Sequence, residues 1–322
     1  MIEIEDLTVI YRTREGKIRA LENINVDIKS NEIFGIVGES GSGKTTLAMT
    51  IMGLLPRNGY VESGSIKVDG DDILKLKPEM ARMVRGKVIS LVFQGAMNSL
   101  NPLLKIEDQV AEPLLIHRST NRGEALRRAR ETLELMGLDS FTWKKYPHEL
   151  SGGMKQRAVI ATAMIMKPSI IIADEPSTAL DVITQAQLMN ILKELQKMAR
   201  ITIIFISHDF PLVSEMADRI MILYGGKPSE IGSNRQILSE AGHPYTKGLI
   251  NSVPMISARS KPEAIPGEPV NIKNPPAGCR FKPRCKMALD SCGSYDYSPK
   301  IIEGDHMIFC KMFEGGKDGR ST

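Results

Sequence analysis

Long hydrophobic runs are absent from this 322-residue sequence. The longest strand-like apolar runs, residues 170–173 and 201–206, are far shorter than the roughly 18 residues that a helix needs to cross a bilayer. The first residues alternate apolar and acidic side chains, which predicts an edge strand and not a signal peptide. The sequence therefore predicts a soluble, intracellular protein that reaches a membrane only through a partner.

A strong excess of one charge is absent as well. The chain has 42 lysine and arginine residues against 38 acidic residues, a net charge of +4, and the basic residues are dispersed. Nucleic-acid binding requires a concentrated basic surface and is therefore not expected. Hydrophobic residues make up 42% of the chain, enough for one large domain with an appendage or for two domains.

A phosphate-binding loop is the most specific feature that is present. Residues 38–45 match the pattern G-x-x-x-x-G-K-[ST], between an apolar run at 33–37 and a helix-compatible segment. Its glycines let backbone N–H groups turn around a phosphate chain, and the next helix directs its positive end at the same anion. We therefore expect the chain to bind a nucleoside triphosphate through Gly38, Ser40, Gly41, Ser42, Gly43, Lys44, Thr45 and Thr46.

Two positions in this set carry a specific chemical expectation. Lys44 would place a positive charge near the β- and γ-phosphates, and the Thr45 hydroxyl would hold Mg²⁺. A second candidate for the metal is Asp174, which ends the apolar run 170–173. Ligands of open α/β sheets collect at strand ends, so Asp174 is expected to bind Mg²⁺ and Glu175 to orient and polarise the attacking water.

The order of predicted elements indicates an α/β fold. Strand-like segments cover residues 7–11, 24–28, 33–37, 64–68 and 89–93, and buried strands follow at 169–173 and 201–206. A helical pattern occupies about 95–165, and a long amphipathic helix is predicted with Leu188, Ile191, Leu192, Leu195 and Met198 on one face. Residues from about 236 onward are rich in proline and lack periodicity, which predicts a loop-rich extension.

A second backbone anion site is predicted at residues 150–157, Leu-Ser-Gly-Gly-Met-Lys-Gln-Arg. Ser151, Gly152 and Gly153 begin a helix there, and a helix amino end attracts phosphate. One nucleotide does not need two such loops. We therefore expect this site to bind the γ-phosphate of ATP held by a different subunit, so that two chains enclose two nucleotides.

Together these motifs resemble the ATP-binding-cassette (ABC) family, over roughly residues 1–235. Residues 38–45 are similar to its Walker A motif, 170–174 to Walker B, 177–181 to the D-loop and 150–157 to the signature, with Met154 where many members have glutamine. Gln94 resembles the Q-loop residue that contacts Mg²⁺, and Glu175 the catalytic glutamate. His208 resembles the switch histidine at the γ-phosphate, with a simple capping role as the alternative. Tyr11 resembles the aromatic residue that stacks on adenine, with a plain strand position as the alternative.

The resemblance implies a fold and a domain division. The fold is a P-loop NTPase cassette of the ABC type, with a RecA-like core, an antiparallel β subdomain and a helical subdomain at about 95–165. The cassette would occupy residues 1–235, and a loop-rich extension would occupy 236–322.

A narrower resemblance is to the ATPases of oligopeptide, dipeptide and nickel importers. It rests on residues 37–44, 93–102, 242–246, 266–267 and 278–281, although Gly95 and Ala96 differ from the common Glu-Pro after Gln94. It implies a paralogous ATPase subunit or a second copy as dimer partner, two transmembrane permease subunits and an extracellular peptide-binding protein. The subunit would lie peripherally on the cytoplasmic face of the plasma membrane and hydrolyse ATP to import di- or oligopeptides; nickel is the alternative solute.

All four cysteines lie in the extension, at Cys279, Cys285, Cys292 and Cys310. Two disulfides are not expected in a reducing cytoplasm, which leaves a metal site or unrelated thiols. The spacing lacks the short C-x₂₋₄-C knuckle usual for zinc, and Arg280, Lys282, Arg284 and Lys286 would offset the charge of an anionic [4Fe–4S] cluster. The importer resemblance also implies a [4Fe–4S] cluster, with zinc as the alternative and a structural role favoured.

Two rival hypotheses come from other functional classes. One is a soluble cassette ATPase of DNA repair or the ribosome, but such proteins carry long coiled-coil insertions or duplicated cassettes. The other is a soluble ABC ATPase whose iron–sulfur extension senses redox state.

Overall fold

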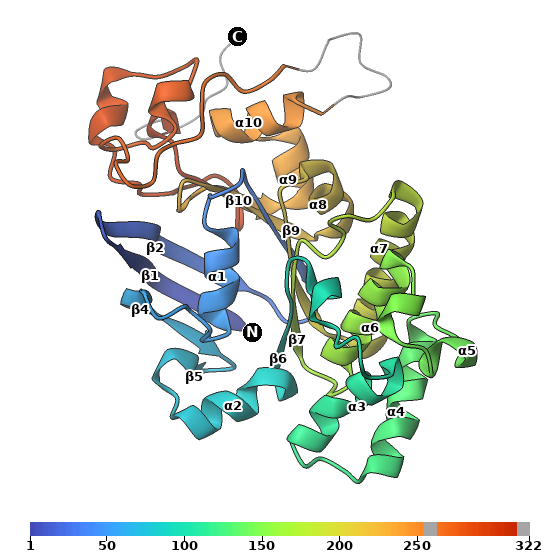
Figure 1. The fold of residues 1–322 in the computed structure, drawn as a ribbon. Helices are drawn as coiled ribbons and strands as arrows, with labels where there is room; N and C mark the ends of the chain where they lie inside the picture. The colour runs from blue at the N-terminus through green and yellow to red at the C-terminus, as the bar shows by residue number, and fades with distance from the viewer. Residues whose placement is uncertain (254–262, 314–322) are drawn as a thin grey trace. The chain divides into compact units, whose positions relative to one another are not determined.

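The computed structural model describes residues 1–253 and 263–313, which form two compact units (Figure 1). The first unit comprises residues 1–28, 34–71 and the described residues from 207 onward; the second comprises 29–33 and 72–206. No helix in the described ranges combines the length and apolar character that crossing a membrane requires.

The first unit contains an antiparallel sheet in the order β2-β1-β4-β5. Its strands are β1 (Ile2–Thr13), β2 (Gly16–Ile28), β4 (Gly59–Val68) and β5 (Asp71–Asp72). Figure 1 shows the longer three side by side in blue. The expectation that the first residues form an edge strand is wrong, because Ile2 pairs with Ile28 on one side and with Val68 on the other. Apolar–acidic alternation reports which face is buried, whereas backbone pairing decides how many neighbours a strand has.

A second group of strands in this unit carries the phosphate loop. Strand β3 (Ile33–Val37) lies parallel to β9 (Arg219–Tyr224), and β9 forms a hairpin with β10 (Lys227–Ser233). The hairpin turn, which the sequence analysis did not predict, is Gly225-Gly226 with φ angles of 54° and 82°, the left-handed region that glycine adopts without strain. The helices of this unit are α1 (Lys44–Ile51), α8 (Phe210–Met216), α9 (Asn234–Ser239) and α10 (Pro244–Asn251).

The extension packs within this first unit and has a core of its own. Strand β12 (Met307–Ile308) pairs with both β10 and β11 (Lys300–Ile301), and short 3₁₀ turns cover Lys282–Arg284, Asp290–Ser294 and Lys311–Phe313. Residues Tyr245, Phe281, Ile308 and Phe309 are all buried. In the described part of the proline-rich segment, residues 263–299, the regular elements are two 3₁₀ turns; α10 and the two short strands, which lie on either side of it, had not been predicted.

The second unit combines three parallel strands with helices. The strands run β8-β7-β6, from β6 (Ile89–Val92), β7 (Ile170–Asp174) and β8 (Thr202–Ser207). The α-helices are α2 (Pro78–Lys87), α3 (Ile106–Ile116), α4 (Arg122–Leu135), α5 (Ser140–Trp143), α6 (Gly152–Met164) and α7 (Val182–Ala199). Shorter 3₁₀ turns occupy Ile73–Lys75, Ala96–Ser99 and Pro147–Glu149.

Helix α7 confirms most of its predicted buried face. Leu188, Leu192 and Leu195 are buried, but Met198 is 73% exposed, so its assignment to that face is wrong. The apolar stripe continues one turn further than the surface against which the helix packs.

Candidate nucleotide-binding and hydrolysis site

The phosphate loop adopts a backbone that favours glycine at several positions. Gly41 and Gly43 have φ angles of 76° and 105°, in the left-handed region. A Cβ atom at Gly38 would lie 2.1 Å from the carbonyl oxygen of Leu223 on β9, so any larger residue there would clash with backbone. Helix α1 begins at Lys44, directly after this turn, and its N–H groups therefore face the loop.

Polar atoms of the loop are positioned for an anion. The Lys44 ammonium is buried and donates to the carbonyl oxygens of Gly38, at 2.7 Å, and Glu39, at 3.0 Å. The Ser42 hydroxyl is buried without a hydrogen-bond partner among the described residues. A buried hydroxyl of this kind is costly unless it bonds to a ligand, and a phosphate oxygen satisfies it. The residues therefore fit a nucleotide.

Tyr11 and the start of α1 lie on the same part of the first unit. The Tyr11 hydroxyl is 3.4 Å from the Thr46 hydroxyl, and its ring is half-buried on β1. Thr45, in the first turn of α1, and Ser40 in the loop are exposed. Stacking of Tyr11 on adenine remains a prediction.

The second unit holds the two acidic residues predicted from the strand end. Asp174 is the buried last residue of β7, and Glu175 follows with a φ angle of 49°. The Gln94 amide donates to a Glu175 carboxylate oxygen at 2.9 Å, and the Thr178 hydroxyl donates to the same oxygen at 3.2 Å. Two donors therefore fix the orientation of this carboxylate. The sequence analysis placed Thr178 in the D-loop resemblance at 177–181 and gave it no role toward Glu175, which it follows by three positions in a turn.

The signature segment begins helix α6 as predicted. Ser151 is the N-cap: its hydroxyl accepts from the Met154 N–H at 3.3 Å, and both Ser151 and Gly152 are exposed. A Cβ atom at Gly153 would lie 2.3 Å from Cγ2 of Thr184 on α7. Glycine at this position therefore permits the close approach of the two helices.

His208 is exposed after β8, next to Asp209, whose carboxylate caps α8 at the Leu212 N–H.

The predicted site residues are divided between the two units. The first unit holds Tyr11, residues 38–46, His208 and the four cysteines, and the second holds Gln94, Ser151, Gly152, Gly153, Asp174 and Glu175.

The four cysteines converge on one small cavity in the extension. All four line it, none forms a disulfide, and three of them are buried while Cys285 is half-buried. Burial raises the pKa of Cys279, of Cys285 and of Cys310, the last to about 11, and neighbouring thiols add to each rise. Within residues 1–253 and 263–313, no group of three or more His, Cys, Asp or Glu side chains has metal-binding geometry. The thiols therefore lie near one another without forming a metal site as placed.

The expectation that nearby cations offset a cluster's charge is wrong for three of the four residues. Arg280 pairs with Glu22, Arg284 with Glu39 and Lys286 with Glu263. Of these four residues Lys282 alone lines the cysteine cavity, which Lys311 also lines, and the Lys282 ammonium donates to the Asp290 carbonyl at 3.2 Å. The carboxylates compensate the arginines, which serve as attachments of the extension.

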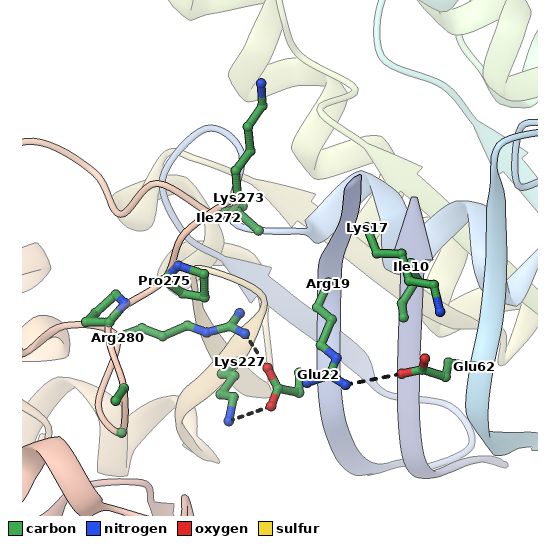
Figure 2. A pocket seen from close by; sticks show the side chains of 13 residues that line it. Ile10, Lys17, Arg19, Glu22, Glu62, Lys227, Ile272, Lys273, Pro275 and Arg280 are labelled. Atoms are coloured by element: carbon green, nitrogen blue, oxygen red, sulfur yellow. Dashed lines mark hydrogen bonds and ion pairs between the residues drawn. The ribbon is translucent and has the colours of Figure 1, made fainter. Parts of the chain in front are cut away.

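A pocket of about 450 Å³ lies beside the Arg280 attachment (Figure 2). Figure 2 shows Arg280 and Lys227 both reaching the Glu22 carboxylate, while Arg19 reaches Glu62. Neither Tyr11 nor any residue of the phosphate loop lines this pocket. It is therefore separate from the nucleotide-binding loop.

Comparison with known proteins identifies the family. The ABC transporter family matches residues 21–178, and the family described as oligopeptide/dipeptide transporter, C-terminal region, matches residues 229–292. The chain is 41% identical over 320 residues to a dipeptide transport ATP-binding protein, DppD, of Caldanaerobacter subterraneus, covering 98% of each chain. It is 39% identical over 297 residues to an oligopeptide transport ATP-binding protein, OppD, of Escherichia coli, covering 91% of this chain and 88% of that one.

A solved structure supports the same assignment. A dimeric ATP-binding cassette in a post-hydrolysis state bound to ADP and Pi matches with a TM-score of 0.66 and 32% identity, covering 73% of this chain and 99% of that one. The predicted P-loop cassette fold is confirmed. The chain belongs to the ABC transporter family, among the ATP-binding subunits of oligopeptide and dipeptide transporters.

Proposed function

We propose that this chain hydrolyses ATP to drive the import of dipeptides or oligopeptides. The observation that carries the proposal is the similarity to a dipeptide transport ATP-binding protein over 98% of both chains, extension included. A general cassette ATPase would match in the cassette alone. The same similarity argues against the soluble repair or ribosomal ATPase.

The loop and its neighbours would bind the nucleotide. Backbone N–H groups within residues 38–46, other than those of Glu39 and Ser42, would hold the phosphates together with the Lys44 ammonium and the buried Ser42 hydroxyl, and Tyr11 would stack on adenine. Thr45, Gln94 and Asp174 would hold Mg²⁺, which neutralises phosphate charge when bound. Glu175, oriented by Gln94 and Thr178, would position and deprotonate water, and His208 would contact the γ-phosphate.

Two cassettes would complete each site. Ser151, Gly152 and Gly153 offer the exposed amino end of α6 to the ATP of the partner, either a paralogous subunit or a second copy. The dimeric cassette bound to ADP and Pi supports this arrangement. Residues 1–235 would form the cassette, and residues 95–165 would dock on two permease subunits at the cytoplasmic face of the membrane, with a peptide-binding protein outside.

Replacing Glu175 by Gln tests the hydrolytic role. We expect turnover to fall at least 100-fold, because general-base catalysis of this kind contributes about 10²–10⁴ in rate, while ATP still promotes dimerisation. Steady-state ATPase assays and size-exclusion chromatography with ATP measure the two effects. Glu131→Gln, which removes an exposed carboxylate on α4, is the matched control. Persistent hydrolysis by Glu175→Gln would remove Glu175 from this role.

The identity of the solute separates the peptide and nickel alternatives. Pull-down of the intact complex from membranes, followed by uptake of labelled peptide or nickel into vesicles, distinguishes them. Peptide-dependent ATPase stimulation supports the proposal, and stimulation by nickel alone would replace it.

We further propose a [4Fe–4S] cluster on Cys279, Cys285, Cys292 and Cys310, with zinc as the alternative. The convergence of four thiols on one cavity supports a shared ligand, which would tie together the loop segments between residues 279 and 310. The raised pKa of three of these thiols means that binding must displace protons.

Cys292→Ser tests this site. We expect the purified protein to lose brown colour, its absorbance near roughly 400 nm and its iron, because a cluster of this type needs four ligands. Metal analysis of the unaltered protein is the second measurement. A colourless preparation with stoichiometric zinc would establish the alternative, and ATPase activity that changed reversibly with redox potential would favour the sensor.

A further inference from the structure

Glu39, the second residue of the phosphate loop, joins this loop to the extension. Its carboxylate pairs with Arg284 at 2.7 Å, its N–H donates to the Tyr245 hydroxyl at 3.1 Å, and its carbonyl accepts from Lys44 at 3.0 Å. We propose that Arg284 and Tyr245 are positioning residues for ATP binding, acting through Glu39. The inference rests on the assignment of residues 38–45 as the ATP phosphate loop.

Arg284 is held rigidly in place. Its side chain is only 6% exposed, and it donates to the Pro266 carbonyl at 2.8 Å and to the Tyr224 hydroxyl at 3.3 Å. Its guanidinium carbon lies 5.7 Å from the centre of the Tyr224 ring and 6.0 Å from that of Phe281. A guanidinium fixed by both hydrogen bonds and aromatic packing sets the position of the carboxylate that it binds.

Tyr245 fixes the backbone of the same residue. It is fully buried, and its ring packs against Tyr224 and Phe281 at centroid distances of 4.6 and 5.3 Å. The Glu39 N–H bonds to this hydroxyl and so is not directed at a phosphate. The first turn of the loop is therefore anchored from the extension, and the Glu39 carbonyl also accepts from the Ser42 N–H at 3.1 Å.

Charge gives Arg284 a second effect. A carboxylate inside a loop that binds a triphosphate repels the ligand, and the repulsion is strong in a partly buried site. Arg284 neutralises Glu39, which is 24% exposed. The Glu39 backbone carbonyl accepts from Lys44, so loss of Arg284 would leave an uncompensated carboxylate on a residue that contacts the phosphate-binding lysine.

The kinetics of four variants test this inference. We expect Arg284→Gln to raise the KM for ATP roughly tenfold, with kcat changed less than about twofold, because it leaves the partly buried Glu39 carboxylate unpaired. Arg284→Lys should recover part of the loss. Glu39→Gln should have a smaller effect, and Arg284→Gln combined with Glu39→Gln should restore most of the ATP affinity, since no unpaired charge remains. Lys286→Gln, which breaks an exposed ion pair in the same segment, is the control.

Three further measurements decide between outcomes. Salt should reduce the KM defect of Arg284→Gln, and hydrogen exchange should show residues 38–42 less protected while 220–223 are unchanged. If Arg284→Gln instead unfolds the extension, the KM values of the Glu39→Gln and Arg284→Lys variants still test the inference.

A wild-type KM in Arg284→Gln, or a double variant with a higher KM than both single variants, overturns the inference. Lys44→Ala should abolish ATP binding; if it does not, the assignment of the phosphate loop fails first, and the inference with it.

Discussion

His243 is an individual residue whose burial makes the stability of the extension sensitive to pH. It caps α10 by accepting from the Tyr245 N–H at 3.0 Å, and burial lowers its pKa to about 4, although the nearby Glu230 carboxylate raises it. The folded protein therefore keeps this imidazole neutral where the unfolded chain, with a pKa of 6.5, would bind a proton. The contribution of His243 to the free energy of unfolding is therefore fully present above about pH 6.5 and is lost as the pH falls toward 4.

We expect the free energy of unfolding to decrease by about 2 kcal/mol between pH 7 and pH 5, since each pKa unit corresponds to about 1.36 kcal/mol. Urea unfolding at both pH values measures this change. His243→Asn keeps a capping acceptor without a titrating group and should remove most of the slope. An equal slope in the variant would assign the pH dependence elsewhere.

The ionisation of Glu230 does not contribute to the change in stability expected between pH 7 and pH 5. Burial opposes its ionisation, but hydrogen bonds from His306 and from the Gly242 N–H hold the pKa of Glu230 below its ordinary value. A carboxylate with a lowered pKa stabilises the fold at neutral pH and loses that effect only as the pH falls below its unfolded value of about 4.5.

Helices α6 and α7 pack so closely that Gly153 of the signature segment is needed for their contact, apart from any role at the nucleotide. We expect Gly153→Ala to destabilise the protein by about 1–3 kcal/mol, because the new Cβ would lie 2.3 Å from Cγ2 of Thr184. Thr184→Ser removes that methyl group and keeps the hydroxyl that bonds to Asp181, so it should restore stability in the double variant. Urea unfolding midpoints measure both effects.

Gly152→Ala is the control for this contact, because its nearest neighbours would be 3.7 Å away, an ordinary packing distance. A double variant as unstable as Gly153→Ala would show that the glycine is needed for its backbone and not for the helix contact.

Elements with a strong local signal were predictable from the sequence. Strand β7 with its terminal Asp174, the N-cap Ser151 and the turn before Lys44 each depend on neighbouring residues and matched expectation. Neither the position of β1 between two other strands nor the exposure of Met198 was predictable. The first depends on which strands pair with β1, and the second on how far the surface that α7 packs against extends. The Glu39–Arg284 pair joins residues 245 positions apart, and neither side chain shows a local pattern that marks it.

At the scale of the whole molecule, the extension is held by a second buried ion pair. Arg280 is 3% exposed and donates to the Gly225 carbonyl and to Glu22 on β2, which also pairs with Lys227 at 3.3 Å. We expect Glu22→Gln to destabilise the protein by about 3–5 kcal/mol, because it leaves two cations in a largely buried site without their counter-charge.

Thermal unfolding measures this loss, with Glu15→Gln as control. Glu15 pairs with Lys273 at the surface, and exposed pairs contribute only about 0–1 kcal/mol. Equal effects of the two substitutions would mean that Glu22 does not anchor the extension.

The contacts of Glu39 with Arg284, Tyr245 and Lys44 also limit which segments can be exchanged between such ATPases. A chimera that exchanges the segment after residue 235 between related importers would separate Arg284 and Tyr245 from the acidic residue that they restrain. Cassette and tail would then be mismatched even where each is intact. A functional chimera would therefore need Glu39, Arg284 and Tyr245 from the same parent protein. These three residues lie on both sides of the boundary near residue 235 that the sequence suggests.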